Sequence, residues 1–146
     1  MFLHFGESTT LLVLIYVDDI LITGSSPTQI SSLITKLDSV FALRDLGRLF
    51  YFLGMEVSYN EGSMHLSQTK YTFDLLHRTT MFDTKPAKTP GAVGQNLSRI
   101  DGDPMEEVTQ YRSIVGALQY LTITRPYITF AINKACQFMQ QPTTAH

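Results

Sequence analysis

The sequence predicts an α+β fold in which two β-hairpins alternate with helices and a helical tail follows. Strand-like apolar runs close on short polar turns twice, at residues 11–24 and 50–66, and a helix-like apolar period follows each of them. Beyond residue 104 only the helical period continues. Of the 146 residues, 44% are hydrophobic and 16% are charged. This composition is typical of a globular protein, and the length suits one domain or part of one.

The first hairpin is predicted over residues 11–23, which place Val, Ile, Leu and Tyr on both sides of the tripeptide VDD. Such runs are typical of two strands that are buried on at least one face. A helix over about residues 27–41 follows, with Ser26 as its N-cap, a proline at its first position and Gln29 completing a capping box. Apolar residues recur along this helix at helical spacing, at Ile30, Leu33, Ile34, Leu37 and Phe41.

The second hairpin is predicted from two strands, Phe50 to Tyr59 and Ser63 to Leu66, which are joined across Asn60-Glu61-Gly62. The glycine suits a turn position with positive φ. We expect Ser67 to cap a following helix over about residues 68–80.

The rest of the chain is predicted to be a linker and a helical tail. Residues 83–103 are polar and rich in proline and glycine, as linkers and surface loops are. A capping box at Asp103–Glu106 predicts a helix whose apolar face carries Val108, Tyr111, Val115 and Leu118. Pro126 can start a second helix, which we expect to run to about Gln141. We expect three aromatic residues of the tail to lie in the core rather than to act as stacking platforms: Tyr111, Tyr120 and Phe130.

Asp18 and Asp19 are adjacent like charges at the point where two apolar runs meet. Two ionised carboxylates repel each other, and burying either one alone is costly. A solvated turn would avoid that cost, and a divalent cation would offset the repulsion. Mg²⁺ takes one or two carboxylates and fills its other positions with water and substrate phosphate. Because side chains alternate along a strand, we expect one aspartate to be a direct ligand and the other to be more peripheral.

Composition excludes several classes of protein. The single cysteine, Cys136, excludes an internal disulfide framework and a cysteine-rich zinc site. The longest apolar run, Leu11 to Val17, is far shorter than the roughly 18 residues that a membrane-spanning helix needs. The first ten residues have neither a basic region nor a small-residue cleavage site, so we expect no secretory signal, no membrane partner and an intracellular protein.

The charge pattern leaves nucleic-acid binding open. A net charge of -2 argues against a uniformly basic surface but allows a local basic groove. Lys70 and Arg78 are candidate phosphate contacts in a loosely basic stretch, although a solvated face explains that stretch nearly as well. The four histidines are scattered and lack the spacing of a metal site.

Four sequence segments, taken in order, carry a resemblance to a known family. They are YVDD at residues 16–19, the stretch FALRDLGRLFYFLGMEVSYNEGSMHLSQTKYTFDLL, the stretch YRSIVGALQYLTITRPYITFAI, and FMQQP. Together they cover about residues 11–146, and the chain resembles the later part of a reverse transcriptase of the copia type of retrotransposon.

The resemblance implies part of a reverse-transcriptase palm, with two β-hairpins packed against helices, followed by a thumb-like helical tail. The palm remainder would span residues 11–82, the linker 83–103 and the thumb-like or connection-like segment 104–146. The activity implied for the intact protein is RNA-directed DNA polymerisation, a two-metal nucleotidyl transfer that uses Mg²⁺ or Mn²⁺. The partners implied are a primer-template, deoxynucleotides, and the fingers and earlier palm.

Several residues acquire roles from the resemblance. Asp18 would be the main metal ligand of its hairpin and Asp19 its catalytic partner. Near the incoming nucleotide or primer end the family places Tyr16 and Val17. The hairpin that grips the primer end would include Phe52, Leu53 and Gly54.

Two departures from the family pattern and two alternatives remain. Arg48 stands where the family usually has an acidic or small polar residue. Tyr127 stands where the family usually has an aspartate. The family's other palm aspartate and its fingers lie upstream of the YVDD hairpin, so we expect this chain alone not to polymerise. One alternative is a non-catalytic retrotransposon remnant with a nucleic-acid-binding or structural role. The other is an unrelated interaction module whose Asp pair is a plain turn.

Overall fold

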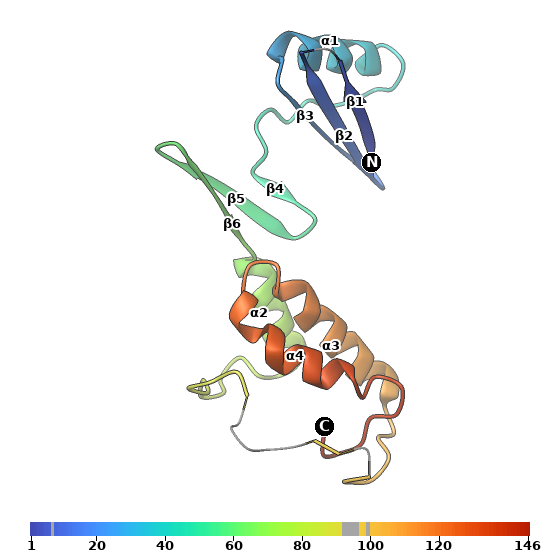
Figure 1. Ribbon diagram of the computed structural model, residues 1–146, viewed down its shortest axis with the longest axis vertical. Helices are drawn as coiled ribbons and strands as arrows, with labels where there is room; N and C mark the ends of the chain where they lie inside the picture. Colours follow the sequence, from blue (N-terminus) through green and yellow to red (C-terminus); the bar gives the residue numbers. More distant parts are fainter. Residues whose placement is uncertain (7, 92–96, 99) are drawn as a thin grey trace. The chain divides into compact units, whose positions relative to one another are not determined.

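The computed structural model describes residues 1–6, 8–91, 97–98 and 100–146 (Figure 1). They form two compact units, residues 1–53 and 54–146. Each unit combines strands with at least one helix, and small antiparallel sheets alternate with helices along the chain. The predicted α+β class is confirmed.

A three-stranded antiparallel sheet forms the first unit together with one helix. Its strands are β1 (Phe2–Phe5), β2 (Thr10–Tyr16) and β3 (Asp19–Gly24), with β2 in the middle. The β2–β3 pair is the predicted hairpin, and Leu14 lies opposite Leu21 in it. Strand β1 was not predicted, because a four-residue segment at the edge of a sheet carries too short a pattern to be distinguished from a loop.

Helix α1 (Pro27–Asp38) lies beside this sheet and contacts β3 (Figure 1). Ser26 is its N-cap and accepts a hydrogen bond from the Gln29 amide, as predicted. The side chain of Gln29 donates instead to the Thr9 hydroxyl at 3.1 Å, so only half of the expected capping box forms. The helix ends at Asp38 rather than at residue 41, and the side chain of Phe41 is exposed.

No described side chain before Phe52 is fully buried in the first unit. One helix can cover only one face of a sheet, and the strand residues on both faces are largely apolar. The sheet is therefore half-buried.

The expected strand from Phe50 to Tyr59 is interrupted. Strand β4 (Tyr51–Phe52) ends at a turn and β5 (Met55–Asn60) begins after it. Leu53 and Gly54 both have positive φ, at 50° and 78°, which no strand residue adopts. The prediction of a continuous strand is therefore wrong. It missed the turn because a leucine carries no local signal for positive φ.

Strands β5 and β6 (Ser63–Ser67) form the second predicted hairpin, and helix α2 (Thr69–Arg78) follows. Asn60 pairs with Ser63 across a two-residue turn. Ser67 does not cap α2, contrary to expectation. Its hydroxyl donates to Glu56 of β5 at 2.6 Å, and the same carboxylate accepts the Lys70 amide of the helix's first turn at 2.9 Å. A strand residue thus replaces the predicted local cap.

The tail contains helix α3 (Val108–Leu121), a 3₁₀ turn η1 (Pro126–Ile128) and helix α4 (Thr129–Cys136). Pro126 starts the second tail helix, as predicted. The capping box at Asp103–Glu106 does not form, because Pro104 forms an isolated bridge with Thr143. Helix α4 stops at Cys136, well before Gln141, and Arg112 binds the Met139 carbonyl at 2.7 Å in the segment beyond it.

The core of the second unit lies between α2, α3 and α4, which pack together in Figure 1. Its centre is Leu75, Ala117 and Leu121. Gln68 is fully buried beside it and bridges the Tyr120 carbonyl and the Thr124 hydroxyl. A buried amide is tolerated there because its polar atoms are hydrogen-bonded.

One aromatic prediction for the tail is wrong. Tyr111 is buried and donates to the Ala135 carbonyl at 2.9 Å, and Tyr120 is half-buried, but Phe130 is 80% exposed.

Among the helices that the structure describes, none is both long and apolar enough to cross a membrane.

Candidate active site

The two aspartates lie at the tip of the β2–β3 hairpin. Tyr16 pairs with Asp19, which leaves Val17 and Asp18 as the two-residue turn. All four side chains are exposed to solvent. Residues directly opposite each other in a ladder project to the same face, so Asp19 shares its face with Tyr16. Asp18 extends from the turn itself, which agrees with two carboxylates in unequal positions.

Val17 has a φ of 50°, a conformation that a β-branched residue rarely adopts. Its side chain is also 79% exposed. A residue in this region costs on the order of 1–3 kcal/mol, and such outliers concentrate at functional sites. The strain therefore marks the same four residues as the carboxylate pair does.

The tip can supply the carboxylates of two residues as ligands to a divalent cation. Asp18 and Asp19 are solvent-accessible carboxylates. Throughout the described residues no group of three or more His, Cys, Asp or Glu side chains is arranged to hold a metal ion. One or two carboxylates, with water and substrate phosphate completing the shell, is the usual protein share of a Mg²⁺ site. The donor set fits such an ion as part of a site.

The residues predicted to resemble a primer grip form the tight turn between β4 and β5. Phe52 is 9% exposed, and Leu53 and Gly54 make the turn with positive φ. A Cβ at Gly54 would lie 3.6 Å from the ring of Tyr71 and 3.7 Å from that of Tyr120. Gly54 thus lies close to an edge-to-face tyrosine pair that joins α2 to α3.

The two candidate phosphate contacts are both exposed on α2. Lys70 lies in the first turn, and Arg78 lies at the end of the helix. Arg78 borders a cavity of about 210 Å³ that it shares with Glu107, Thr109 and other residues at the start of α3. This cavity brings a cation, hydroxyl groups and one carboxylate together.

Glu56 is a residue that the local patterns missed. Its pKa is lowered from the ordinary value, chiefly because the Ser67 hydroxyl and then the Lys70 amide donate to the carboxylate. A cap that comes from a strand fourteen residues away leaves no signal in the four residues around a helix start. The one sequence signal for Glu56 is its position within YFLGMEV, part of a stretch that carries the family resemblance.

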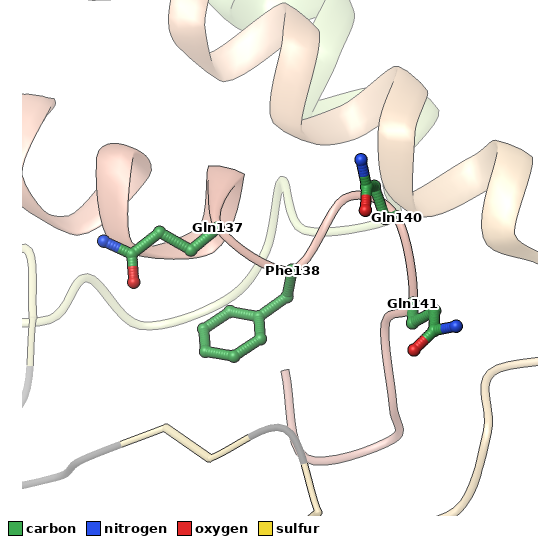
Figure 2. Close-up of a pocket in the computed structure, with 4 residues that line it drawn as sticks. All are labelled: Gln137, Phe138, Gln140 and Gln141. Atoms are coloured by element: carbon green, nitrogen blue, oxygen red, sulfur yellow. The ribbon is translucent and has the colours of Figure 1, made fainter.

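A smaller cavity of about 50 Å³ adjoins the segment that follows α4. Figure 2 shows that the amide groups of Gln137, Gln140 and Gln141 point in different directions, with the ring of Phe138 between them. A space of this size has room for little more than water, and its lining residues carry no charge. The hairpin tip remains the better candidate for chemistry.

Comparison with known proteins assigns the chain to a class and then to a narrower group. Residues 1–93 match the family model described as reverse transcriptase, RNA-dependent DNA polymerase. The chain belongs to this reverse transcriptase family. Its relatives further place it with the Pol polyproteins of copia-type retrotransposons.

Three curated relatives cover most of the chain. It is 46% identical over 134 residues to the retrovirus-related Pol polyprotein from transposon RE1 of Arabidopsis thaliana, which covers 92% of the chain and 9% of that protein. It is 47% identical over 133 residues to an uncharacterized mitochondrial protein of the same plant, covering 91% of the chain and 55% of that protein. Identity to the Pol polyprotein from tobacco transposon TNT 1-94 is 33%, over 99% of the chain and 12% of the relative.

The chain therefore spans about a tenth of each Pol polyprotein and about half of the mitochondrial protein. No solved structure matches it.

Proposed function

We propose that the β2–β3 hairpin is the catalytic hairpin of an RNA-directed DNA polymerase, with Asp18 as the direct metal ligand and Asp19 as its more peripheral partner. The observation that carries the proposal is the tip itself. It exposes two carboxylates on a two-residue turn that is strained at Val17, in a chain of the reverse transcriptase family. A tip free of covering side chains is what a primer-template and a nucleotide would need to approach.

The reaction would be attack of a primer 3′-hydroxyl on the α-phosphate of a deoxynucleotide, with pyrophosphate as the leaving group. Bound Mg²⁺ or Mn²⁺ ions would supply the positive charge that this transfer needs, and Asp18 and Asp19 are the residues that would hold them. Asp18 holds and positions that charge and is not itself the general base. Tyr16, on the same face of the ladder as Asp19, borders the nucleotide or primer end together with Val17.

The remaining parts take the roles that the family suggests. The turn at Phe52, Leu53 and Gly54 would hold the primer end. Residues 11–82 would belong to the palm and 104–146 to a thumb-like or connection-like segment, joined by the linker 83–103. Lys70 and Arg78, exposed on α2, would contact phosphates of the primer-template.

A hybrid polymerase tests the proposal. Residues 11–93 would replace the matching segment of the transposon RE1 Pol polyprotein, and extension of a DNA primer on an RNA template would be measured in Mg²⁺. We expect Asp18→Ala to abolish extension. Asp19→Ala should lower the rate by about 10–100-fold, as loss of a supporting group around a metal does.

Glu61→Gln is the matched control, because Glu61 is an exposed carboxylate at the turn of the other hairpin. It should leave extension unchanged. Full activity in Asp18→Ala would overturn the assignment of the hairpin. An inactive hybrid with an intact fold would instead favour a non-catalytic remnant.

The unmodified chain should extend no primer by itself, because its described residues bring no third metal-ligating side chain to the aspartate pair. It should bind divalent ions weakly, since Mg²⁺ dehydrates reluctantly. In an NMR titration with Mn²⁺, the amides of residues 16–19 should broaden first. Asp18→Asn should reduce that broadening more than Asp19→Asn does, and equal loss from both would contradict the unequal roles.

A further inference from the structure

Charge is distributed unequally along the chain. Of its 11 basic and 13 acidic residues, three basic and no acidic ones fall in residues 108–146. The net charge of residues 108–146 is therefore +3, and that of the preceding 107 residues is −5. The three cations are Arg112, Arg125 and Lys134. A basic segment within an acidic protein is the kind of asymmetry that accompanies polyanion binding.

Arg125 lies between α3 and η1 with incomplete partners. Its two terminal nitrogens make long contacts, 3.3 Å to the Tyr127 hydroxyl and 3.5 Å to the Thr72 hydroxyl. Its Nε is buried and has no acceptor within the described part of the chain. A guanidinium normally prefers short, paired bonds to a carboxylate or a phosphate. Arg125 is therefore a cation whose anionic partner does not come from the described residues.

Two exposed aromatic side chains follow Arg125 in the chain, and the first of them contacts its guanidinium. Tyr127 is 65% exposed and contacts Arg125 directly. Phe130 is 80% exposed and follows Tyr127 by three residues along the helical turn from η1 into α4, so the two rings lie on one side. Ile123, two residues beyond the end of α3, is 57% exposed. Aromatic surface that is exposed to this extent contributes little buried apolar area to the core of the unit.

We infer that Arg125, Tyr127 and Phe130 form a contact surface for single-stranded nucleic acid. The guanidinium would take a phosphate, and the two rings would stack on neighbouring bases. This arrangement of a cation beside open aromatic faces is how proteins hold single strands without reading their sequence. The inference rests on the proposed function, which makes nucleic acid the substrate, and it adds a second surface that would contact a strand.

The test is fluorescence anisotropy of the full chain with an end-labelled 20-nucleotide single strand, either oligo(dT) or oligo(U). Phe130→Ala and Tyr127→Ala should each weaken binding at least about fivefold, because a base stacked on an aromatic ring contributes strongly to affinity. The loss should be smaller for a blunt duplex, whose bases are not available to stack. Arg125→Gln should lower the slope of log affinity against log salt by about 0.7, the value for one phosphate contact on a single strand.

Matched controls come from the acidic part of the chain. Phe41→Ala removes a ring that is 58% exposed, and Lys36→Gln removes an exposed cation. Both should bind like the wild type. Arg125→Lys keeps the charge, so it should restore the salt slope even where Arg125→Gln perturbs the fold, and circular dichroism melts identify any variant that is unfolded.

Three results would overturn the inference. They are no binding of the single strand by the wild-type chain, unchanged affinity in the Tyr127 and Phe130 variants, and an equal loss in Phe41→Ala. In the second case the patch would be a protein contact instead. The hybrid polymerase contains residues 11–93 of this chain and lacks Arg125, Tyr127 and Phe130, so it reports on the catalytic hairpin alone, and failure of the binding experiment is separate from failure of the hairpin.

Discussion

The β2–β3 and β5–β6 hairpins each turn on two residues, but only the second places a glycine where φ is positive. Gly62 has a φ of 73° and follows Glu61 in the second turn. The first turn places Val17 in the left-handed region, followed by Asp18. A positive φ at the first loop residue alone is the pattern of a type II′ turn, which usually begins with glycine.

The residue with positive φ, glycine in one turn and valine in the other, distinguishes a turn built for stability from a turn whose sequence is constrained by something other than stability. Glycine adopts positive φ without the Cβ clash, whereas a β-branched residue incurs it. No carboxylate pair accompanies the relaxed turn, and the strained one carries Asp18 and Asp19. Strain and carboxylates together are what a functional tip would show.

The largest effect should come from giving the second turn the residue type of the first. Gly62→Val should lower the free energy of unfolding by about 1–2 kcal/mol, the cost of a left-handed conformation for a residue with a Cβ. No atom lies within 4 Å of the added Cβ, so packing would not contribute. Urea denaturation measures the loss. Gly62→Asn, which tolerates this region, should lose much less, and equal losses would mean that φ is not the cause.

The reciprocal change should stabilise the first turn. Val17→Gly relieves the strain but adds freedom to the unfolded chain, so the net gain should be about 0.5–1 kcal/mol. The same denaturation experiment measures it. In the hybrid polymerase this variant should extend primers more slowly, because the tip loses its fixed shape. A less stable Val17→Gly protein would show that the valine packs against something after all.

Removing a charge at the first tip should have a smaller effect. Asp18→Asn relieves repulsion with Asp19 and should raise stability by a few tenths of a kcal/mol without divalent ions, about the size of an exposed charge interaction. Thermal melts at low salt would detect it, and high salt should remove it. Glu61→Gln, at the other tip, should change nothing. A structural aspartate would behave oppositely, and losses of about 1 kcal/mol or more in both Asp18→Asn and Asp18→Ala would show that the fold holds it.

The smallest effect concerns the anchoring of the second hairpin and appears only in acid. Glu56 has a lowered pKa in the folded chain, so its bonds to Ser67 and Lys70 stabilise the fold above pH 4.5, the ordinary value for a free carboxyl. This contribution is lost as the pH falls through the lower, folded pKa. Amide exchange at the start of α2 should rise over that range. Glu56→Gln should raise exchange already at neutral pH and remove the pH dependence, and an unchanged pH profile would exclude this cap.

Several elements could be predicted because neighbours in the chain decide them. Apolar runs on both sides of VDD and of the Asn60–Gly62 turn predicted two hairpins, and both are present. Ser26 caps α1 and Pro126 starts the second tail helix, as expected from rules that act within four residues. The carboxylate pair was found in the same way, since a short tip keeps its side chains exposed whatever surrounds it.

Sequence alone thus determined the family, the two hairpins, most of the helix starts and the exposed aspartates. Only the tertiary structure decided that Glu56 caps α2, that Pro104 forms a bridge with Thr143 instead of starting a helix, and that Phe130 lies open to solvent. The physical reason is range. A cap, a turn or an apolar period is set by residues within a turn or two of one another, whereas these three outcomes depend on which distant segment arrives to accept a hydrogen bond or cover a ring.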